Sequence, residues 1–479
     1  MTNPIEPERI KSLNNRLLQK GKFVLYWMQQ SQRADWNPAL EYAIIRANET
    51  KKPLVIVFGL TTCYPEANLR HYTFMLQGLF DTMAALKSRG IRMFIVNADP
   101  DRAALEAGKH ASEIICDRGY TRIQKQWRFN VARESACPLT QVESDVVVPV
   151  ETVSEKAEYA ARTIRPKILK HLTRFLRPVE KVPLRTSSLS IEIPELNMKN
   201  ILADNSKSID DHKMETLLGN LEIDTAIRPV TRFFHGGFSH AQKRFNLFLK
   251  DSLEKYSQNS NQPQTNDTSC MSPYLHFGHI SPVYLALQIQ NKKTPDPEIH
   301  QATKDAFLEE LIVRRELAAN FIHFTLNYDS YNCLPEWAQK TLKDHKKDHR
   351  PRTYNINELE QARTHDPYWN AAMEEMKFTG FMHNYMRMYW GKKILEWSAT
   401  PEAAFQTTLL LNNKYFLDGR DANSFAGVAW IFGVHDRAWK ERDIFGKVRY
   451  MNAAGLERKC DIKEYVQKIE KVKTLAQNS

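Results

Sequence analysis

The sequence predicts two domains of different class: an α/β domain with a doubly wound parallel sheet, followed by an all-α domain. Two observations lead to this prediction. In the first part of the chain, apolar runs of strand length alternate with helical patterns, which is typical of parallel strands joined by helices. From about Thr231 onward the pattern is almost wholly helical, and six of the nine tryptophans lie between Trp337 and Trp439. We expect the α/β domain at residues 1–152, an interdomain linker at 153–230 and the helical domain at 231–479.

The α/β domain is expected to hold five strands, which are short runs rich in apolar or β-branched residues: Phe23–Met28, Leu54–Leu60, Ile91–Asn97, Glu113–Asp117 and Val146–Val150. Helical patterns near Asn37–Glu49 and at Leu69–Ser88 separate the first three. Such connections form right-handed crossovers. Neither GxGxxG nor GxxxxGK[ST] follows any of these strands, so no phosphate-binding loop is spelled out in this domain.

The next segment changes character along its length. Lys156–Leu176 is basic and has a helical pattern, whereas Pro178–Ser208 is rich in Pro, Ser and Thr and is expected to be a surface linker. The helices expected beyond it are Ser239–Tyr256, Pro282–Asn291, Thr303–Asn320, Asn355–Arg363, Pro367–Thr379, Phe381–Trp397, Pro401–Leu411 and Asp461–Thr474.

Composition limits the class of protein. The longest apolar run, Leu54–Leu60, has strand length, so no membrane span is expected, and the first residues lack the features of a secretory signal. Six scattered cysteines without a CxxC pair indicate free thiols in a reducing compartment and predict no metal site. The net charge of +11 and the isoelectric point near 9.1 favour a polyanionic partner, nucleic acid first. We expect a cytoplasmic protein at the nucleoid, or a nuclear one in a eukaryote.

Two polar motifs each allow a structural and a functional interpretation. The turn before Ser272-Pro273 offers hydroxyl and backbone N–H groups to an anion, but on pattern alone Ser272 is better explained as an ordinary helix N-cap. Glu310 and Arg314 stand four residues apart and are expected to pair on one helix face. The alternative places Glu310 in a pocket facing a base carbonyl, with Arg314 near a phosphate.

Aromatic residues form two further patterns. Trp390 and Trp397 lie seven residues apart, hence on one helix face about 10 Å apart along the axis. With Trp369 and Tyr389 they form a dense core or an electron path, and pattern alone favours the core.

The stretch Trp430–Tyr450 interleaves aromatic side chains with Arg437, Lys440, Arg442, Lys447 and Arg449, which suits stacking on the bases and neutralising the phosphates of an opened DNA strand. For the Lys340–Arg352 segment a solvated basic loop is the favoured interpretation.

Together these motifs resemble those of class II cyclobutane pyrimidine dimer DNA photolyases, in the photolyase/cryptochrome family. The resemblance covers nearly the whole chain in the same order. Its motifs are YWMQQSQRADWNPAL (Tyr26–Leu40), EYAARTIRPKI (Glu158–Ile168), SPYLHFGHIS (Ser272–Ser281), FLEELIVRRELAANF (Phe307–Phe321), THDPYWNAA (Thr364–Ala372), MRMYWGKKILEW (Met386–Trp397), LDGRDANSFAG (Leu417–Gly427) and GVHDRAWKER followed by GKVRYM.

The resemblance implies an α/β domain and a helical domain that holds FAD in a U shape. By similarity, Tyr256 and the turn Thr268, Ser269, Cys270, Met271 and Ser272 would grip the FAD phosphates. Arg387 and Asp418 would form an ion pair beside the isoalloxazine, with Arg420 among the cofactor-binding residues. Asn412 would face the flavin N5. The sheet domain would be the place for a second, antenna chromophore, a deazaflavin if one is present.

It also implies the roles of the substrate residues. Trp390 and Trp369 would relay electrons, with Trp397 as a neighbouring indole, and Glu310 would hydrogen-bond the dimer. Met388 and Trp430 would line its pocket, Arg314 would contact a phosphate, and Arg437 and Arg449 would fill the bubble left in the duplex. The expected activity is light-driven splitting of pyrimidine dimers in double-stranded DNA by a monomer without an obligate protein partner.

Two alternatives remain open from the sequence. A cryptochrome-like flavoprotein would bind FAD and sense light without repairing DNA. A flavin-free DNA-binding module would have kept the fold alone.

Overall fold

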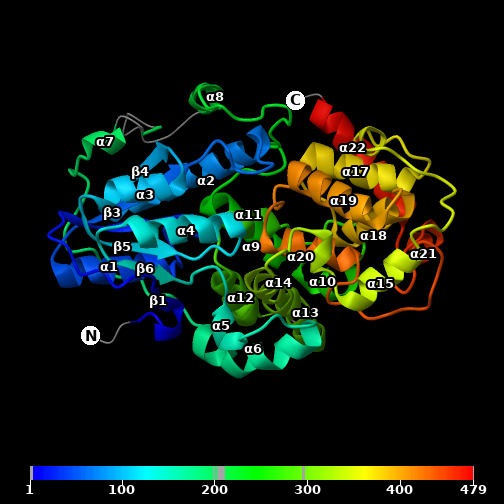
Figure 1. Cartoon of the computed structure of the whole chain (residues 1–479), viewed down its shortest axis with the longest axis horizontal. Coiled ribbons are helices and arrows are strands. Elements are labelled where there is room, and N and C mark those ends of the chain that lie inside the picture. Colours follow the sequence, from blue (N-terminus) through cyan, green and yellow to red (C-terminus); the bar gives the residue numbers. More distant parts are fainter. Residues whose placement is uncertain (1–3, 198–199, 202–210, 294–296, 478–479) are drawn as a thin grey trace.

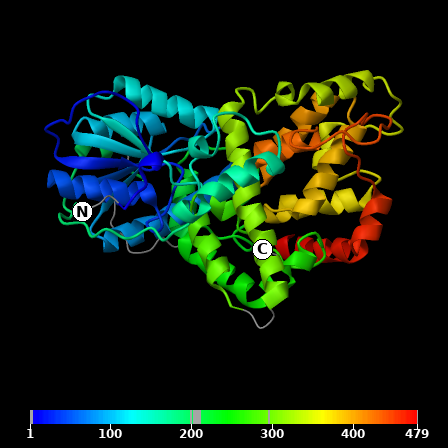
Figure 2. The same cartoon turned by 90° about the horizontal axis from the view of Figure 1, so that it is seen from below.

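The computed structural model describes residues 4–197, 200–201, 211–293 and 297–477. The sheet domain and the helical domain lie side by side (Figure 1), and the view from below shows helices of the middle of the chain between them (Figure 2). No helix among the described residues is long and apolar enough to cross a membrane.

The sheet has six strands in the order β1-β6-β5-β2-β3-β4. Their bounds are β1 Ile10–Ser12, β2 Phe23–Trp27, β3 Leu54–Leu60, β4 Arg92–Asn97, β5 Ala111–Asp117 and β6 Leu139–Val142. All neighbours pair in parallel except the edge strand β1, which runs antiparallel to β6. The predicted parallel sheet is therefore confirmed, with one antiparallel edge strand added.

Helices cover both faces of this sheet. The helices α1 (Pro38–Thr50) and α2 (Leu69–Ser88) pack on one face, and α3 (Pro100–Gly108) and α4 (Arg122–Glu134) on the other. Strands β2, β3 and β5 are buried along their whole length, which explains why they read as continuous apolar runs and not as alternating ones.

One predicted strand is wrong, and two strands were missed. Residues 146–149 form no strand, because the N–H groups of Val147 and Val148 donate to the Glu316 carboxylate at 2.6 and 3.1 Å and not to a neighbouring strand. Val150 already begins the short helix α5 (Val150–Val153). The two missed strands, β1 and β6, span only three and four residues, too short for a periodic pattern.

Part of the segment after residue 153, namely helix α6 (Ala161–Phe175), packs against the helical domain. The predicted basic helix is present as α6, and its apolar side packs in one cluster with Phe245, Phe307 and Ile312 of the helical domain. The short helices α7 (Pro194–Asn197) and α8 (Asp211–Gly219) follow. Residues 198–199 and 202–210 of the predicted linker lie outside the described residues, and the domain boundaries at 152 and 230 stay a prediction.

The helical domain confirms the predicted helical pattern. Its helices are α9 Phe238–Asp251, α10 Tyr256–Asn259, α11 Ser272–His276, α12 Pro282–Asn291, α13 Pro297–Leu308, α14 Arg315–Phe324, α15 Glu336–Asp344, α16 Ile356–Glu360, α17 Pro367–Thr379, α18 Asn384–Trp397, α19 Pro401–Tyr415, α20 Ala422–Ile431, α21 Ala453–Lys459 and α22 Ile462–Gln477. A π-helical segment, Glu309–Arg314, joins α13 to α14, and short 3₁₀ turns lie at Pro7–Arg9, Leu253–Lys255 and Tyr331–Cys333.

Buried arginines fasten the two domains together. Arg33 of the sheet domain is fully buried and donates to the carbonyl oxygens of Gly278 (3.0 Å) and Ser144 (2.7 Å). Arg70 on α2 donates to the carbonyl oxygen of Tyr415 at 2.7 Å. Gly278 has φ +66°, and a Cβ there would lie 1.9 Å from the carbonyl oxygen of Gln30, so only glycine permits this approach.

Candidate functional site

The predicted ion pair between Arg387 and Asp418 is present. One Nη of Arg387 on α18 lies 2.8 and 2.9 Å from the two carboxylate oxygens of Asp418, in the loop after α19. The guanidinium also stacks on the Phe416 ring, 3.8 Å from its centroid. Asp418 is buried and Arg387 is half-buried. A ligand can therefore reach the Arg387 guanidinium, whose position is fixed by Asp418 and by the Phe416 ring.

Asn412 lies in the last turn of α19 and is buried beside this pair. Its amide N–H groups donate to Asn413 Oδ1 at 3.0 Å and to the Ser424 hydroxyl. Asn413 Oδ1 also accepts from the backbone N–H of Arg420 at 3.0 Å. Both amide side chains are thereby held in one orientation, and in the described part of the chain no protein group donates to the side-chain oxygen Oδ1 of Asn412. The contact of Asn412 with a flavin N5 stays a prediction.

Tyr256 on α10 and Glu310 in the π-helical segment lie close enough to interact electrostatically. Tyr256 packs against Phe248 and Phe307, with ring centroids 5.8 and 5.3 Å away. Burial raises the pKa of the Tyr256 phenol, and the nearby Glu310 carboxylate raises it further. Burial likewise raises the pKa of Glu310, opposed by Arg314, although its side chain remains open to solvent. Glu310 thus combines a raised pKa with an accessible carboxyl group, which a ligand can reach.

The predicted pairing of Glu310 with Arg314 is wrong. Arg314 Nε donates to Glu309 at 3.1 Å, and Glu309 also accepts from Arg165 of α6 at 2.7 and 2.9 Å. The reason is the π-helical geometry of Glu309–Arg314, in which residues five apart, not four, are neighbours. This arrangement pairs Glu309 with two cations, whereas the adjacent Glu310 carboxylate forms no ion pair with any residue that the structure describes.

The turn from Thr268 to Ser272 differs from the expected N-cap. Ser272 is the first residue of α11, and the residue before it is Met271, whose side chain is buried. Cys270 has φ +52° and directs its thiol back to the Thr268 hydroxyl at 3.6 Å. The interpretation of Ser272 as a structural N-cap is therefore wrong, and the Thr268, Ser269 and Ser272 hydroxyls stay partly open to solvent.

Buried polar atoms near this turn lack protein partners. The Lys468 ammonium donates to the carbonyl oxygens of Pro263 and Thr265 at 3.1 and 2.9 Å, and its charge contributes to lowering the pKa of His383, which burial lowers most. Gln264 Oε1 and His383 Nε2 are both buried without a partner among the described residues. Unpartnered buried polar atoms are uncommon, and here they fit a polar ligand that completes their hydrogen bonds.

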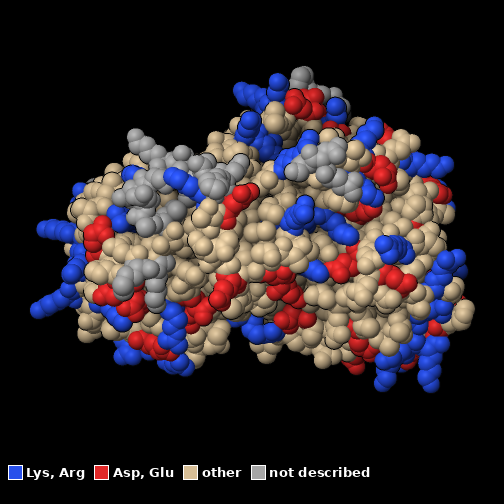
Figure 3. Space-filling model, turned by 90° about the horizontal axis from the view of Figure 1, so that it is seen from above, with Lys and Arg blue, Asp and Glu red and all other residues tan. Residues whose placement is uncertain are grey.

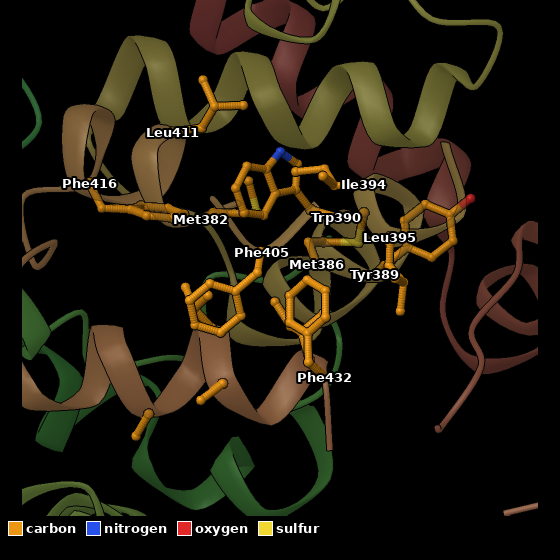
Figure 4. Packing of buried hydrophobic residues seen from close by; sticks show 14 of the residues in the cluster. Met382, Met386, Tyr389, Trp390, Ile394, Leu395, Phe405, Leu411, Phe416 and Phe432 are labelled. Atoms are coloured by element: carbon orange, nitrogen blue, oxygen red, sulfur yellow. The ribbon is translucent and has the colours of Figure 1, made fainter. Parts of the chain in front are cut away.

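The tryptophans form a connected chain. Trp390 of α18 and Trp369 of α17 are stacked, with centroids 6.4 Å apart and planes at 11°, and Trp369 meets Trp397 at 5.5 Å. Trp390 also contacts Phe416, 6.3 Å away, and Figure 4 shows it at the centre of the buried cluster. The sequence placed Trp390 and Trp397 on one helix face. The structure inserts Trp369 from a second helix between them.

The chain of rings continues to residues that the sequence did not single out. Trp397 contacts Tyr354 at 5.2 Å and His365 at 5.4 Å, and the Tyr354 hydroxyl lies 2.7 Å from His365 Nδ1. His365 is exposed. At the other end, Phe416 joins Trp390 to the Arg387–Asp418 pair. These contacts depend on tertiary packing, so no spacing in the sequence could have indicated them.

Three of the five predicted DNA-contacting residues, Trp430, Arg437 and Arg449, lie close together. Arg449 stacks on both Trp430 and Trp439, at 5.5 and 4.1 Å, and Arg437 stacks on Trp439 at 5.1 Å. Asp436 holds Arg449 at 2.8 and 3.1 Å. Met388 is half-buried, one residue beyond Arg387 on α18. The structure therefore brings Trp430, Arg437 and Arg449 together.

Lys392, which no sequence pattern singled out, packs its ammonium group against the Trp430 ring. Its ammonium lies 5.2 Å from the Trp430 ring and donates to the carbonyl oxygen of Ile431. Lys392 is fully buried, and burial lowers its pKa to about 7, with Arg449 adding to the shift and Asp436 opposing it. A lysine that follows a glycine in a helical pattern is normally predicted to be exposed to solvent, so the sequence gave no indication that Lys392 is buried against Trp430.

The backbone of Arg420 is bound to Asn413 beside Asn412, but its side chain lines a cavity that none of the other predicted cofactor-binding residues lines. Burial lowers the pKa of its guanidinium to about 10, and the cavity lies between the two domains. The sheet-domain side of this cavity includes Gln29, Thr61, Tyr64, Tyr72 and Trp127. The structure thus contains a second candidate site, where the strands β2 and β3 end. Within the described ranges, no group of three or more His, Cys, Asp or Glu side chains is arranged to hold a metal ion.

The sequence of this chain is similar to one protein family and to several proteins of known name. The protein family described as DNA photolyase matches residues 24–184. A protein named deoxyribodipyrimidine photo-lyase from Methanothermobacter thermautotrophicus is 50% identical over 466 residues, covering 97% of this chain and 98% of that one. Its namesake from Arabidopsis thaliana is 36% identical over 490 residues, covering 98% and 94%.

Solved structures share the fold at lower identity. A bacterial class III photolyase from Agrobacterium tumefaciens superposes with a TM-score of 0.68 at 16% identity, covering 94% of this chain and 87% of that one. A cryptochrome from Synechocystis sp. PCC6803 gives a TM-score of 0.66 at 15% identity, covering 95% and 88%. At such identities these likenesses show the fold alone.

Proposed function

Because this chain belongs to the DNA photolyase family, we propose that it is a light-driven repair lyase that splits cyclobutane pyrimidine dimers in DNA. One observation carries the proposal beyond family membership. Helix α18 presents, within six residues, Arg387 of the ion pair, Met388, Trp390 of the tryptophan chain and Lys392 behind Trp430. The candidate cofactor site, relay and lesion pocket therefore share one wall.

The cofactor that fits the first of these sites is FAD. Its phosphates match the Thr268, Ser269 and Ser272 hydroxyls and His383 Nε2, which carries the ring proton because Nδ1 accepts from the Tyr385 N–H. The Arg387–Asp418 pair and the Asn412 carbonyl oxygen would hold the isoalloxazine. When bound and reduced, FAD supplies the light-driven one-electron chemistry, which no side chain provides.

The residues of the chain bind the lesion and shape its surroundings. A pyrimidine dimer stacks poorly, so moving it out of the duplex into a pocket costs less than moving two normal bases. Trp430 and Met388 offer it apolar walls, and a protonated Glu310 donates to a pyrimidine carbonyl, where negative charge develops. The raised pKa of Glu310 favours the protonated form that this donation requires. The tryptophan chain connects this interior to the surface at His365.

Finer assignments follow from the motifs. We assign the chain to class II, on the order and length of the motifs from Tyr26–Leu40 to the end of the GKVRYM run. The interdomain cavity at Arg420, lined by aromatic rings and amides, would hold a deazaflavin antenna. We further propose that the protein acts as a monomer on double-stranded DNA, in the cytoplasm of a prokaryote or the nucleus of a eukaryote.

The test is repair of a defined lesion. The purified protein is reconstituted with FAD, chemically reduced, mixed with an oligonucleotide duplex that carries one thymine dimer, and illuminated with blue light. Restored thymines in the light and none in the dark are expected. Flavin binding without dimer loss would instead identify a light sensor, and a protein that takes up no flavin would leave only a DNA-binding module.

A further inference from the structure

The hairpin at residues 437–447 packs against helix α15 and the residues that follow it, up to Asp348. The backbone N–H of Lys447 donates to the Thr341 hydroxyl at 3.0 Å, and that of Ile444 donates to Asp348 at 2.8 Å. Gly446 approaches α15 so closely that a Cβ would lie 2.2 Å from Thr341 Oγ1. The hairpin that carries Arg437 and Trp439 is therefore held in place by α15.

His345 fastens the same two segments through its ring. Its Nδ1 lies 2.6 Å from Asp348 and its Nε2 lies 3.0 Å from Glu441 of the hairpin. The hydrogen bond to Glu441, followed by the interaction with Asp348, raises the pKa of His345. His345 therefore links the segment after α15 to the hairpin. Because of this link and the two hydrogen bonds above, α15 and the hairpin form one continuous surface.

This surface carries more than half of the excess charge of the chain. Residues 340–352 contain six Lys and Arg against two Asp and Glu, and residues 437–447 contain four against two. These 24 residues thus contribute a net +6 to the total of +11. Over the face of the molecule that is seen from above, basic and acidic side chains are interspersed (Figure 3).

Several of these cations are available for a ligand. Lys340 is paired with Asp344 at 3.4 Å and Lys346 with Glu402 at 3.3 Å. Lys343 and Lys347 are exposed and have no ion pair within the described part of the chain. The exposed cations of residues 340–352 and 437–447 are called the α15 surface below.

The α15 surface is continuous with the lesion pocket. Arg449, two residues beyond the hairpin, stacks on Trp430 and on Trp439. A duplex whose lesion reaches Trp430 therefore has one of its arms next to the hairpin and helix α15. Duplex DNA carries one negative charge per about 1.7 Å of helix axis, so this arm offers many phosphates to the exposed cations of the α15 surface.

We propose that the α15 surface binds the phosphate backbone of one duplex arm beside the lesion, in addition to the contacts within the bubble. The inference rests on the proposed function, because it takes the lesion at Trp430 as its starting point. Its consequence is an asymmetric footprint: one arm of the duplex contributes to affinity through α15, and the other does not.

The test removes the two unpaired lysines and measures how affinity depends on salt. For a dimer-containing duplex with long arms, the plot of log affinity against log salt concentration should become less steep by about 2 in the Lys343→Gln/Lys347→Gln variant, since each lost phosphate contact changes the slope by about 0.9. Lys20→Gln/Lys22→Gln is the matched control. These exposed lysines precede β2 in the sheet domain, at the other end of the molecule from α15 (Figure 1), and their loss should leave the slope unchanged.

Shortening the duplex locates the contact. When one arm is cut back to about half a helical turn, about 5 bp, the wild type and the α15 variant should bind with the same slope. When the other arm is cut back, the difference should persist. A folded variant with an unaltered slope, or a difference that survives both truncations, would overturn the proposal. Failure of the wild type itself to repair the dimer would instead contradict the proposed function.

Discussion

At the scale of single residues, Trp369 decides whether the aromatic side chains act as a relay. Among the residues that the structure describes, its ring alone contacts both Trp390 and Trp397, so its replacement interrupts the chain without changing either end. We expect Trp369→Phe to slow the photoreduction of oxidised flavin strongly, and to spare repair by enzyme that was reduced chemically. The smaller ring should cost about 1–3 kcal/mol of stability through the cavity it leaves.

Flavin bleaching under blue light with an external reductant measures the first effect, and dimer repair by the pre-reduced protein measures the second. Equal loss of both would show that Trp369 is needed for the fold of the site and not for electron relay.

Lys392 predicts an unusual dependence of stability on pH. Its pKa falls from that of an ordinary lysine, about 10.4, to about 7 in the folded protein. Between these values the unfolded chain binds more protons than the folded one, so the penalty of burying this residue is largest below pH 7 and disappears toward pH 10. We expect Lys392→Met to raise the free energy of unfolding by about 1–4 kcal/mol at pH 6, and by less at pH 9.

Urea unfolding at the two pH values provides the measurement. The neighbouring Lys393, which pairs with Glu396 at 2.7 Å, serves as the control, because its replacement by Met should show no such trend. A stabilisation that is equal at both pH values would mean that Lys392 gains nothing from deprotonation. The same variant should bind dimer DNA more weakly, since Trp430 loses its support.

At the scale of secondary-structure elements, one N-cap positions the relay. Asp366 caps α17 by accepting from the N–H groups of Tyr368 and Trp369 at 3.0 and 3.1 Å, and it also accepts from the Tyr389 hydroxyl. Asp366→Ala should lower the free energy of unfolding by about 1–3 kcal/mol. Because the lost cap lies next to Trp369, flavin photoreduction should slow as well.

Ser281→Ala offers a matched comparison for this cap. Ser281 caps α12 by accepting from the N–H of Tyr284 at 3.4 Å, and the buried residues of α12 belong to another hydrophobic cluster than the tryptophans. Its loss should cost about 1 kcal/mol and leave photoreduction unchanged. If both variants slow photoreduction in proportion to their loss of stability, the cap at Asp366 has no specific effect on Trp369.

At the scale of the whole molecule, the docking of the two domains depends on Gly278. Any side chain there would collide with the carbonyl oxygen of Gln30 and would have to adopt φ +66°. Gly278→Ala should therefore lower the free energy of unfolding by at least about 2 kcal/mol, and separate unfolding of the two domains should become visible in urea titrations followed by fluorescence and by circular dichroism.

Gly427→Ala is the control for this glycine. Gly427 lies in α20 with nothing within 4 Å of a Cβ, so alanine there should stabilise the helix by about 0.5–1 kcal/mol. A Gly278→Ala protein as stable and cooperative as the wild type would show that the interface adapts to a side chain at this position.

The sequence by itself determined the two domain classes, the central strands and most helices, because these depend on periodicity and on Pro and Asn or Asp residues that act locally. Through its long motifs it also indicated the Arg387–Asp418 pair and the members of the tryptophan chain. It missed β1 and β6, and its fifth strand was wrong, since Glu316, remote in sequence, satisfies the backbone at Val147 and Val148.

Only the tertiary structure decided how the remaining residues are used. It exchanged the partner of Arg314 through a π-helical turn, inserted Trp369 between two indoles of another helix, and turned Arg420 toward a second cavity. It also buried Lys392 behind Trp430 and attached the Lys340–Arg352 segment to the hairpin. Each of these joins side chains from different elements, and such contacts follow from how the elements pack, which local sequence patterns do not encode.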